Sequence, residues 1–228
     1  MRVVSDKECK NGGYLHELHE HYSAPPPPIR PNPPINCTRM WREWLNETHP
    51  MHICRLADIL GVLPESLEMM ECAWNDRQNC WAMPMRDQYN EIVGLQLRWE
   101  DGFKKTLSGS HNGMFIPRQK TNGCVVVTEG ASDCAAALSL GLCAIGRHSC
   151  CDSVQRIASA IRNMRVSRAI IVADPDEPGI RGATKLAEQM PVPCCVYIPP
   201  AEDFRTAYRN GLTPEMWNAS IDSISWSK

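Results

Sequence analysis

Short runs of β-branched and other apolar residues recur in the second half of the chain, and each is followed by a segment with helical spacing. Continuous apolar runs of this length are typical of buried parallel strands. Their alternation with helical segments predicts a repeated βα arrangement and a mostly parallel sheet. Strands are expected over 125–128, 143–145, 169–173 and 194–198. Helices are expected over 131–140, 152–164 and 181–190, with a helical tail that starts near Asp203.

The preceding region has a different period and predicts a second, smaller sheet. Residues 36–72 have helical spacing, with Gly61 suited to a helix C-terminus and Pro64 to the first turn of the next helix. From Trp81 onward, apolar runs at 82–86, 92–99, 103–107 and 114–116 are separated by polar turns. This pattern predicts short strands in a largely antiparallel sheet.

The first 36 residues are polar and rich in proline. Seven of the eighteen prolines lie between Ser23 and Pro34, which predicts an extended polyproline spacer in a flexible segment. A short helix is expected over 14–22. Its histidines do not form the His-Glu-x-x-His pattern, so a solvated segment is favoured over a metal site; they are His16, His19 and His21. The expected organisation is therefore a flexible segment (1–36), a small α+β lobe (37–119) and an α/β domain (120–228).

Composition is that of a soluble globular protein. Hydrophobic residues make up 43% of the chain and charged residues 22%. No apolar run approaches the roughly 18 residues that span a bilayer, and the N-terminus lacks the apolar core of a secretory signal. A cytoplasmic protein with no membrane partner is expected. The formal net charge of −2 argues against strong duplex affinity for the isolated chain.

Twelve cysteines raise the question of disulfides or zinc, and their spacing argues against both. The chain has no Cys-x-x-Cys, and the adjacent pairs Cys150-Cys151 and Cys194-Cys195 are poorly placed to bind one metal. Thiols in the cytoplasm stay reduced, and a buried cysteine behaves as a small hydrophobic residue. Structural thiols without zinc are therefore expected.

Acidic residues follow two of the predicted strands at the point where each strand ends. Glu129 follows the strand at 125–128, and Asp174 and Asp176 follow the strand at 169–173. Ligands bind at the carboxyl ends of the strands in open α/β sheets, so these side chains are expected to share one site. Carboxylate oxygens are ligands that Mg²⁺ prefers. The sequence therefore predicts metal-dependent phosphoryl chemistry.

The acidic pattern as a whole is specific. Glu129-Gly130-x-Ser132-Asp133 is followed, 45 residues after the glutamate, by Asp174-x-Asp176-x-x-Gly179. In this order and spacing, the two motifs resemble the Toprim domain shared by primases, topoisomerases and several nucleases. The resemblance extends from about Gly123 to Gly211. It implies an α/β fold with a Toprim-type parallel sheet of about four strands flanked by helices.

The Toprim resemblance also implies residue roles. Glu129, Asp174 and Asp176 would be catalytic and would bind Mg²⁺ or Mn²⁺, with Glu129 acting as a metal ligand or as a general base. Asp203 resembles the third acidic position of the family and is expected to be an outer metal ligand. Asp133 would either begin the following helix or assist the metal. The glycines that would let the backbone turn closely beside the site are Gly130 and Gly179.

The region before the acidic motifs narrows the resemblance. Residues 56–67, 83–87, 92–98 and 103–110 resemble the segment that precedes Toprim in phage- and plasmid-type DNA primases, where it forms the first half of the RNA polymerase domain. This implies a nucleotidyltransferase that makes short RNA or DNA primers from NTPs on single-stranded DNA. Three basic residues would then line a groove and contact phosphates, unless they are merely solvated; they are Arg98, Lys104 and Lys105.

Other interpretations stay open. The sequence has no cysteine pairs of a primase zinc module and no helicase domain, so a helicase or other replication protein is expected as a separate partner. A topoisomerase is disfavoured because no tyrosine-bearing breakage domain is evident. The alternatives are a Toprim-type metal-dependent nuclease and a non-catalytic subunit that binds nucleic acid or a replication partner. Origin in a mobile element or phage-like replication system is expected from family analogy alone.

Overall fold

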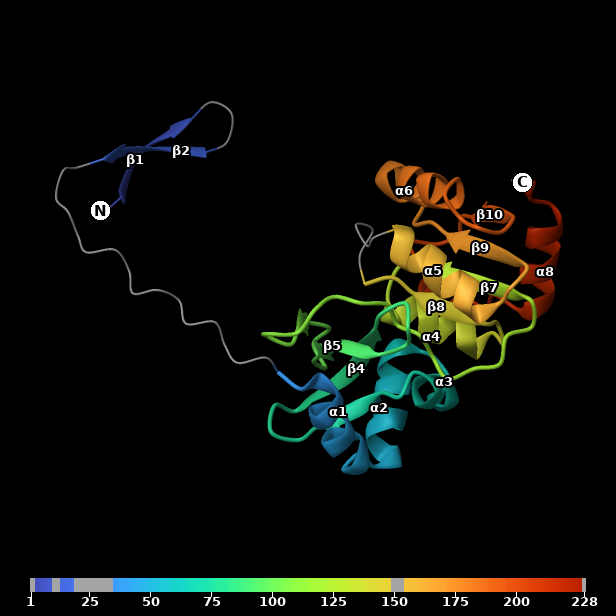
Figure 1. Ribbon diagram of the computed structural model, residues 1–228, viewed down its shortest axis with the longest axis horizontal. Coiled ribbons are helices and arrows are strands. Elements are labelled where there is room, and N and C mark those ends of the chain that lie inside the picture. Colours follow the sequence, from blue (N-terminus) through green and yellow to red (C-terminus); the bar gives the residue numbers. More distant parts are fainter. Residues whose placement is uncertain (1–2, 10–12, 19–34, 149–153, 227–228) are drawn as a thin grey trace. The chain divides into compact units, whose positions relative to one another are not determined.

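The computed structural model describes residues 3–9, 13–18, 35–148 and 154–226. The chain divides into two units, Met1–Pro33 and Pro34–Lys228 (Figure 1). In the first unit, β1 (Val3–Cys9) pairs antiparallel with β2 (Gly13–Leu18). The helix expected over 14–22 is therefore wrong for residues 14–18, because their backbone groups bond to β1 and an isolated helix of nine residues is marginal in water. His19, His21 and the polyproline stretch lie outside the described residues.

The second unit begins with three helices, α1 (Cys37–Asn46), α2 (Pro50–Leu60) and α3 (Pro64–Met69). Gly61 ends α2 with a φ of 66°, and its N–H donates to the Ala57 and Asp58 carbonyls. Pro64 occupies the first turn of α3, where a missing N–H costs nothing. Both helix boundaries predicted from the sequence are confirmed.

An antiparallel sheet follows, in the order β3-β4-β5-β6. Its strands are β3 (Ala73–Asn75), β4 (Cys80–Arg86), β5 (Ile92–Arg98) and β6 (Lys104–Thr106). The strand expected at 114–116 is instead a pair of single bridges, from Met114 to Arg86 and from Phe115 to Gly146. These residues cannot extend one strand because they pair with two different sheets, and they thereby connect the two lobes.

The parallel sheet has the order β10-β9-β7-β8 (Figure 1). Its strands are β7 (Cys124–Thr128), β8 (Ala144–Gly146), β9 (Arg168–Val172) and β10 (Cys194–Tyr197). The helices are α4 (Ala131–Ser139), α5 (Val154–Met164), α6 (Glu177–Ala187), α7 (Phe204–Arg209) and α8 (Pro214–Asp222). The predicted fold class, a four-stranded parallel sheet flanked by helices and preceded by a small α+β lobe, is confirmed.

Alternate residues of the parallel strands enter two different cores. Val126 and Ile170 pack with α4, α8 and the helices α2 and α3 of the first lobe. Val127 and Ile171 pack on the opposite face with α5 and α6. The first of these cores is continuous from α2 to α8, so the two lobes share buried surface within one unit. The boundary expected at 119–120 stays a prediction.

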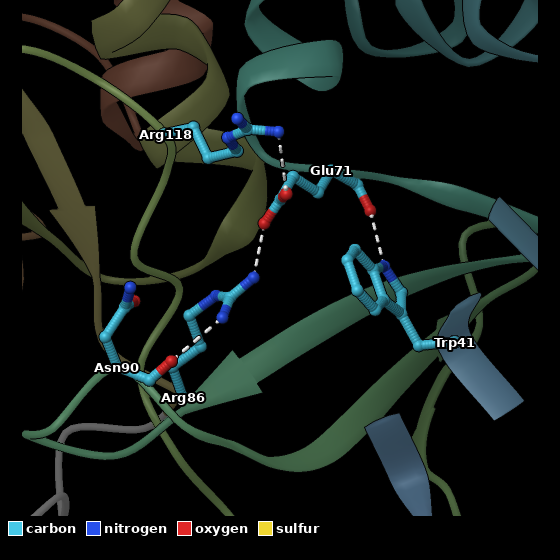
Figure 2. Close-up of polar contacts among 5 residues, drawn as sticks. All are labelled: Trp41, Glu71, Arg86, Asn90 and Arg118. Carbon is cyan, nitrogen blue, oxygen red and sulfur yellow. Dashed lines mark hydrogen bonds and ion pairs between the residues drawn. The ribbon is translucent and has the colours of Figure 1, made fainter. Parts of the chain in front are cut away.

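Glu71, in the loop between α3 and β3, joins several elements of the first lobe to the connection with the second. Figure 2 shows Arg86 and Arg118 directed at its carboxylate, while the Trp41 indole N–H donates to its carbonyl oxygen at 2.9 Å. Arg86 also donates to the Asn90 carbonyl at 2.9 Å.

Among the described residues, none of the helices combines the length and apolar character that a membrane crossing requires.

Candidate active site

Glu129 and Asp174 meet at the carboxyl ends of neighbouring parallel strands. Glu129 directly follows β7, and Asp174 comes two residues after β9, which pairs with β7 along its length. Burial, followed by hydrogen bonding to Asp174, raises the pKa of Glu129 to about 7. Ionising both of two carboxyl groups in such contact is energetically unfavourable, so a positive charge beside the pair stabilises it.

That positive charge comes from Arg147, which the sequence analysis did not single out. Arg147 follows β8, and its Nη2 lies 3.0 Å from Glu129 Oε1. The arginine side chain is only 3% exposed, and its charge opposes the rise in the Glu129 pKa. Arg147 comes two residues after the strand predicted at 143–145, so its place at the same edge of the sheet as Glu129 could be expected, but not which strand lies beside it.

Asp176 is turned toward the start of α6. It is the N-cap residue, and its Oδ1 accepts the Gly179 N–H at 2.7 Å. The helix expected from 181 therefore begins at Glu177, because Asp176 satisfies an N–H in its first turn. Gly179 lies against the acidic loop: a Cβ there would be 2.7 Å from the Asp174 carbonyl oxygen. Gly130 is the N-cap of α4 and has a φ of 153°, which favours glycine.

A second acidic pair, Asp133 and Asp203, lies where the first turn of α4 meets the start of α7. Asp133, in the first turn of α4, is buried and accepts the Arg205 backbone N–H at 3.1 Å. Burial, with a smaller contribution from Asp203, raises the pKa of Asp133 to about 6. Asp203 caps α7 by accepting the Thr206 N–H at 2.6 Å, and the Arg205 guanidinium lies 3.7 Å from its Oδ2. Asp133 therefore lies in the first turn of α4, and its role beside the metal stays a prediction.

Basic residues from the antiparallel sheet lie close to this second pair. Arg98 ends β5 opposite Lys104 of β6, and burial and the nearby Arg205 lower the pKa of Arg98. The Lys104 residue is exposed, yet burial of its amino group and Arg98 lower its pKa, while Asp133 and Asp203 act in the opposite direction. Lys105 belongs to the other face of the strand, because successive residues alternate. The structure therefore brings Arg98 and Lys104 to the acidic residues and leaves Lys105 apart.

The donor atoms of these residues suit Mg²⁺ or Mn²⁺, since carboxylate oxygens are hard ligands. Within 35–148 and 154–226, however, no three Asp, Glu, His or Cys side chains are gathered so as to hold a metal ion. In the structure Glu129 is paired with Arg147, Asp176 accepts the Gly179 N–H, and Asp203 accepts the Thr206 N–H. The metal roles of Glu129, Asp174, Asp176 and Asp203 stay predictions.

Solved structures with a similar fold include primase catalytic cores. The catalytic core of the E. coli primase is 14% identical, with a TM-score of 0.64 over 83% of this chain and 79% of that one. The primase fragment of the bacteriophage T7 primase-helicase protein is 22% identical, with a TM-score of 0.58 over 71% of each chain. The RNA polymerase domain of the Mycobacterium tuberculosis primase DnaG is 14% identical, with a TM-score of 0.61 over 83% and 79%.

This chain has the fold of a primase catalytic core. No protein-family model matches its sequence, and no curated protein does. The primase fold includes both the parallel sheet and the antiparallel sheet, which agrees with the resemblance drawn from the motifs. The fold likeness leaves the roles of the individual acidic and basic residues as predictions.

Proposed function

We propose that this chain is a DNA primase-like nucleotidyltransferase. It would join nucleotides from NTPs into short RNA or DNA primers on a single-stranded DNA template, with Mg²⁺ or Mn²⁺ as cofactor. The observation that carries the proposal is the contact between Glu129 and Asp174 at the carboxyl ends of β7 and β9. Its context is the primase fold, and one solved neighbour is a DnaG primase catalytic domain bound to single-stranded DNA.

The chemistry requires a primer hydroxyl to attack the α-phosphate of an NTP as pyrophosphate leaves. A divalent cation, when bound, would supply charge stabilisation and orientation of the phosphate oxygens. Glu129, with its pKa raised to about 7, could accept the hydroxyl proton or bind the cation, and both roles stay open. Asp174 keeps the Glu129 carboxyl group in place by hydrogen bonding.

The basic side chains near the acidic residues complement the negative charge of the phosphates. Arg98 is buried, and its Nε has no hydrogen-bond partner within the part of the chain that the structure describes. Lys104 and Arg205 lie close enough to affect one another's charge. Cations held together in this way are stabilised by an added anion, so we assign nucleotide or template phosphates to Arg98 and Lys104. Lys105 would contact the template farther from the acidic residues.

The decisive experiment is primer synthesis. The purified chain is incubated with labelled NTPs, single-stranded DNA and Mg²⁺ or Mn²⁺, and the products are separated by length. We expect short oligonucleotides from the wild type and none from Asp174→Ala or Asp176→Ala. Asp58→Ala, on the exposed side of α2, is the matched control and should behave as the wild type.

The other outcomes have distinct meanings. Shortening of the template without new product would indicate a Toprim-type nuclease. A shift in template mobility with neither product would indicate a non-catalytic binding subunit. Folded Asp174→Ala and Asp176→Ala variants with full synthesis would remove both residues from the mechanism. Addition of a replicative helicase tests for a partner, as in the primase-helicase protein of bacteriophage T7.

A further inference from the structure

Arg147 is held against Glu129 by the backbone on which it stands. Its N–H donates to the Thr128 carbonyl at 2.8 Å, and the preceding Gly146 exchanges two 2.9 Å hydrogen bonds with Phe115. Gly146 also lies so close to the turn between β7 and α4 that a Cβ there would be 2.7 Å from the Gly130 carbonyl oxygen. The guanidinium therefore reaches Glu129 from a fixed backbone position.

The contact is incomplete as a structural ion pair. Arg147 Nη2 donates to Glu129 Oε1, but its buried Nε has no partner among the residues that the structure describes. An unsatisfied buried donor on a charged group is costly, and a purely structural arginine would be expected to satisfy it. The arrangement instead places one positive charge on two carboxyl groups, Glu129 and Asp174, that contact each other.

We propose that Arg147 acts as an internal cation that competes with a divalent metal ion for Glu129. The guanidinium occupies a carboxylate oxygen that the metal would need, so the resting chain binds metal weakly. The inference rests on the proposed function only for the position of the metal. Arg147 is a positioning residue here, because it acts on the metal through Glu129.

Competition and a purely structural role predict opposite changes in metal affinity when Arg147 is removed. If Arg147 competes with the metal, its removal frees Glu129 Oε1 and adds net negative charge, so the metal binds more tightly. If Arg147 only holds Glu129 in place, its removal leaves the carboxylate less ordered and the metal binds more weakly. The sign of the change in affinity decides between the two.

The experiment is a titration of the full chain with Mn²⁺ alone, with free Mn²⁺ measured by electron paramagnetic resonance at a pH above the Glu129 pKa. We expect Arg147→Met to lower the Mn²⁺ dissociation constant by roughly tenfold. Arg147→Lys, which keeps the charge, should change it by less than about threefold. Arg55→Met removes an exposed arginine paired with Glu100 and should leave Mn²⁺ binding unchanged.

Two further variants keep the result interpretable. Arg147→Gln keeps a hydrogen-bond donor for Glu129 without the charge, and it replaces Arg147→Met if that variant does not fold. The gain in affinity should disappear when Glu129→Gln is combined with the neutral Arg147 variant. An unchanged or weaker affinity in a folded neutral variant would overturn the proposal.

Metal binding is measured without nucleotide or template, so the outcome is separate from the test of function. Tighter Mn²⁺ binding by Arg147→Met in a chain that makes no primers would support the competition and reject the primase. Primer synthesis with unchanged Mn²⁺ binding in Arg147→Met would support the primase and reject the competition.

Discussion

The Arg205 backbone N–H donates to Asp133 Oδ1 at 3.1 Å and joins two residues that are 72 positions apart. The bond ties the first turn of α4 to the first turn of α7. Asp133 is 7% exposed, and its pKa rises from the ordinary 3.8 to about 6, with burial as the largest cause. The acid is therefore held more readily protonated in the folded chain than in the unfolded one.

This shift predicts how stability depends on pH. An acid with a raised pKa contributes stability that is complete below about 3.8 and is lost as the pH rises through about 6. Asp133→Asn keeps the acceptor for Arg205 and removes the titration. As the pH rises between those values, we expect the free energy of unfolding of Asp133→Asn to increase relative to that of the wild type by up to about 3 kcal/mol. Above them the difference should stay constant.

Urea unfolding at a series of pH values measures this difference. Asp58→Asn, on the exposed side of α2, is the control and should run parallel to the wild type. A constant difference between Asp133→Asn and the wild type across the series would contradict the assignment of the raised pKa to Asp133.

Gly179 predicts a steric effect on the acidic loop. A Cβ at this position would lie 2.7 Å from the Asp174 carbonyl oxygen and 2.8 Å from Asp176 Oδ1, so the loop must move. We expect Gly179→Ala to lower primer synthesis by about tenfold or more, since small displacements of positioning residues cost large factors in rate. Steady-state synthesis at saturating NTP is the measurement.

Gly182 provides the matched control because it lies in the same helix and a Cβ there meets nothing within 4 Å. Alanine in a helix interior stabilises by roughly 0.5–1 kcal/mol relative to glycine. Gly182→Ala should therefore keep its activity and unfold at a slightly higher temperature. Equal activity in the two alanine variants would show that the acidic loop tolerates the displacement.

Local sequence was sufficient for the elements whose pattern is strong. Two continuous apolar runs, Val125–Val127 and Ala169–Ala173, predicted β7 and β9. A buried parallel strand can be recognised from such a run even when its neighbouring strands are unknown. The three-residue β3 (Ala73–Asn75) was missed because it is too short to show a period. Residues 14–18 were assigned to a helix because so short a segment does not distinguish helical from strand periodicity, and pairing with β1 decides the outcome.

The acidic site was predictable in part for the same reason. Glu129 and Asp174 could be brought together from their positions after two parallel strands. Arg147 could not be matched to Glu129 from chain order alone, since that requires knowing that β8 lies next to β7. Asp176 could have been recognised as a helix cap, because an aspartate before Glu177 and Pro178 is a typical helix start.

The cysteines predict a graded reactivity. Cys54 is exposed on α2, whereas burial raises the pKa of Cys72 to about 12 and that of Cys80 to about 11. The thiolate is the reactive form, so brief treatment of the native chain with N-ethylmaleimide should modify Cys54 well before Cys72. Peptide mass spectrometry measures the order, and unfolding in urea should abolish it. Modification of Cys72 as fast as Cys54 in the native chain would contradict its burial.

Glu71 carries the last prediction, which concerns the junction in Figure 2. The Glu71 and Arg86 side chains are each 11% exposed and form an ion pair, and the more exposed Arg118 lies 3.6 Å from the same carboxylate. Glu71→Gln would leave the Arg86 charge buried without a counter-charge. We expect a loss of about 3–5 kcal/mol in the free energy of unfolding, which is the usual effect of breaking a buried pair.

Two comparisons separate that charge effect from a general loss of contacts. The Trp41 indole donates to the Glu71 backbone carbonyl, so Glu71→Gln leaves this bond intact. Combining Glu71→Gln with Arg86→Met removes both charges and should recover part of the lost stability. Glu43→Gln breaks the exposed pair with Arg39 and should cost less than about 1 kcal/mol. If Glu71→Gln were no more destabilising than Glu43→Gln in urea unfolding, the buried pair would contribute nothing to the junction.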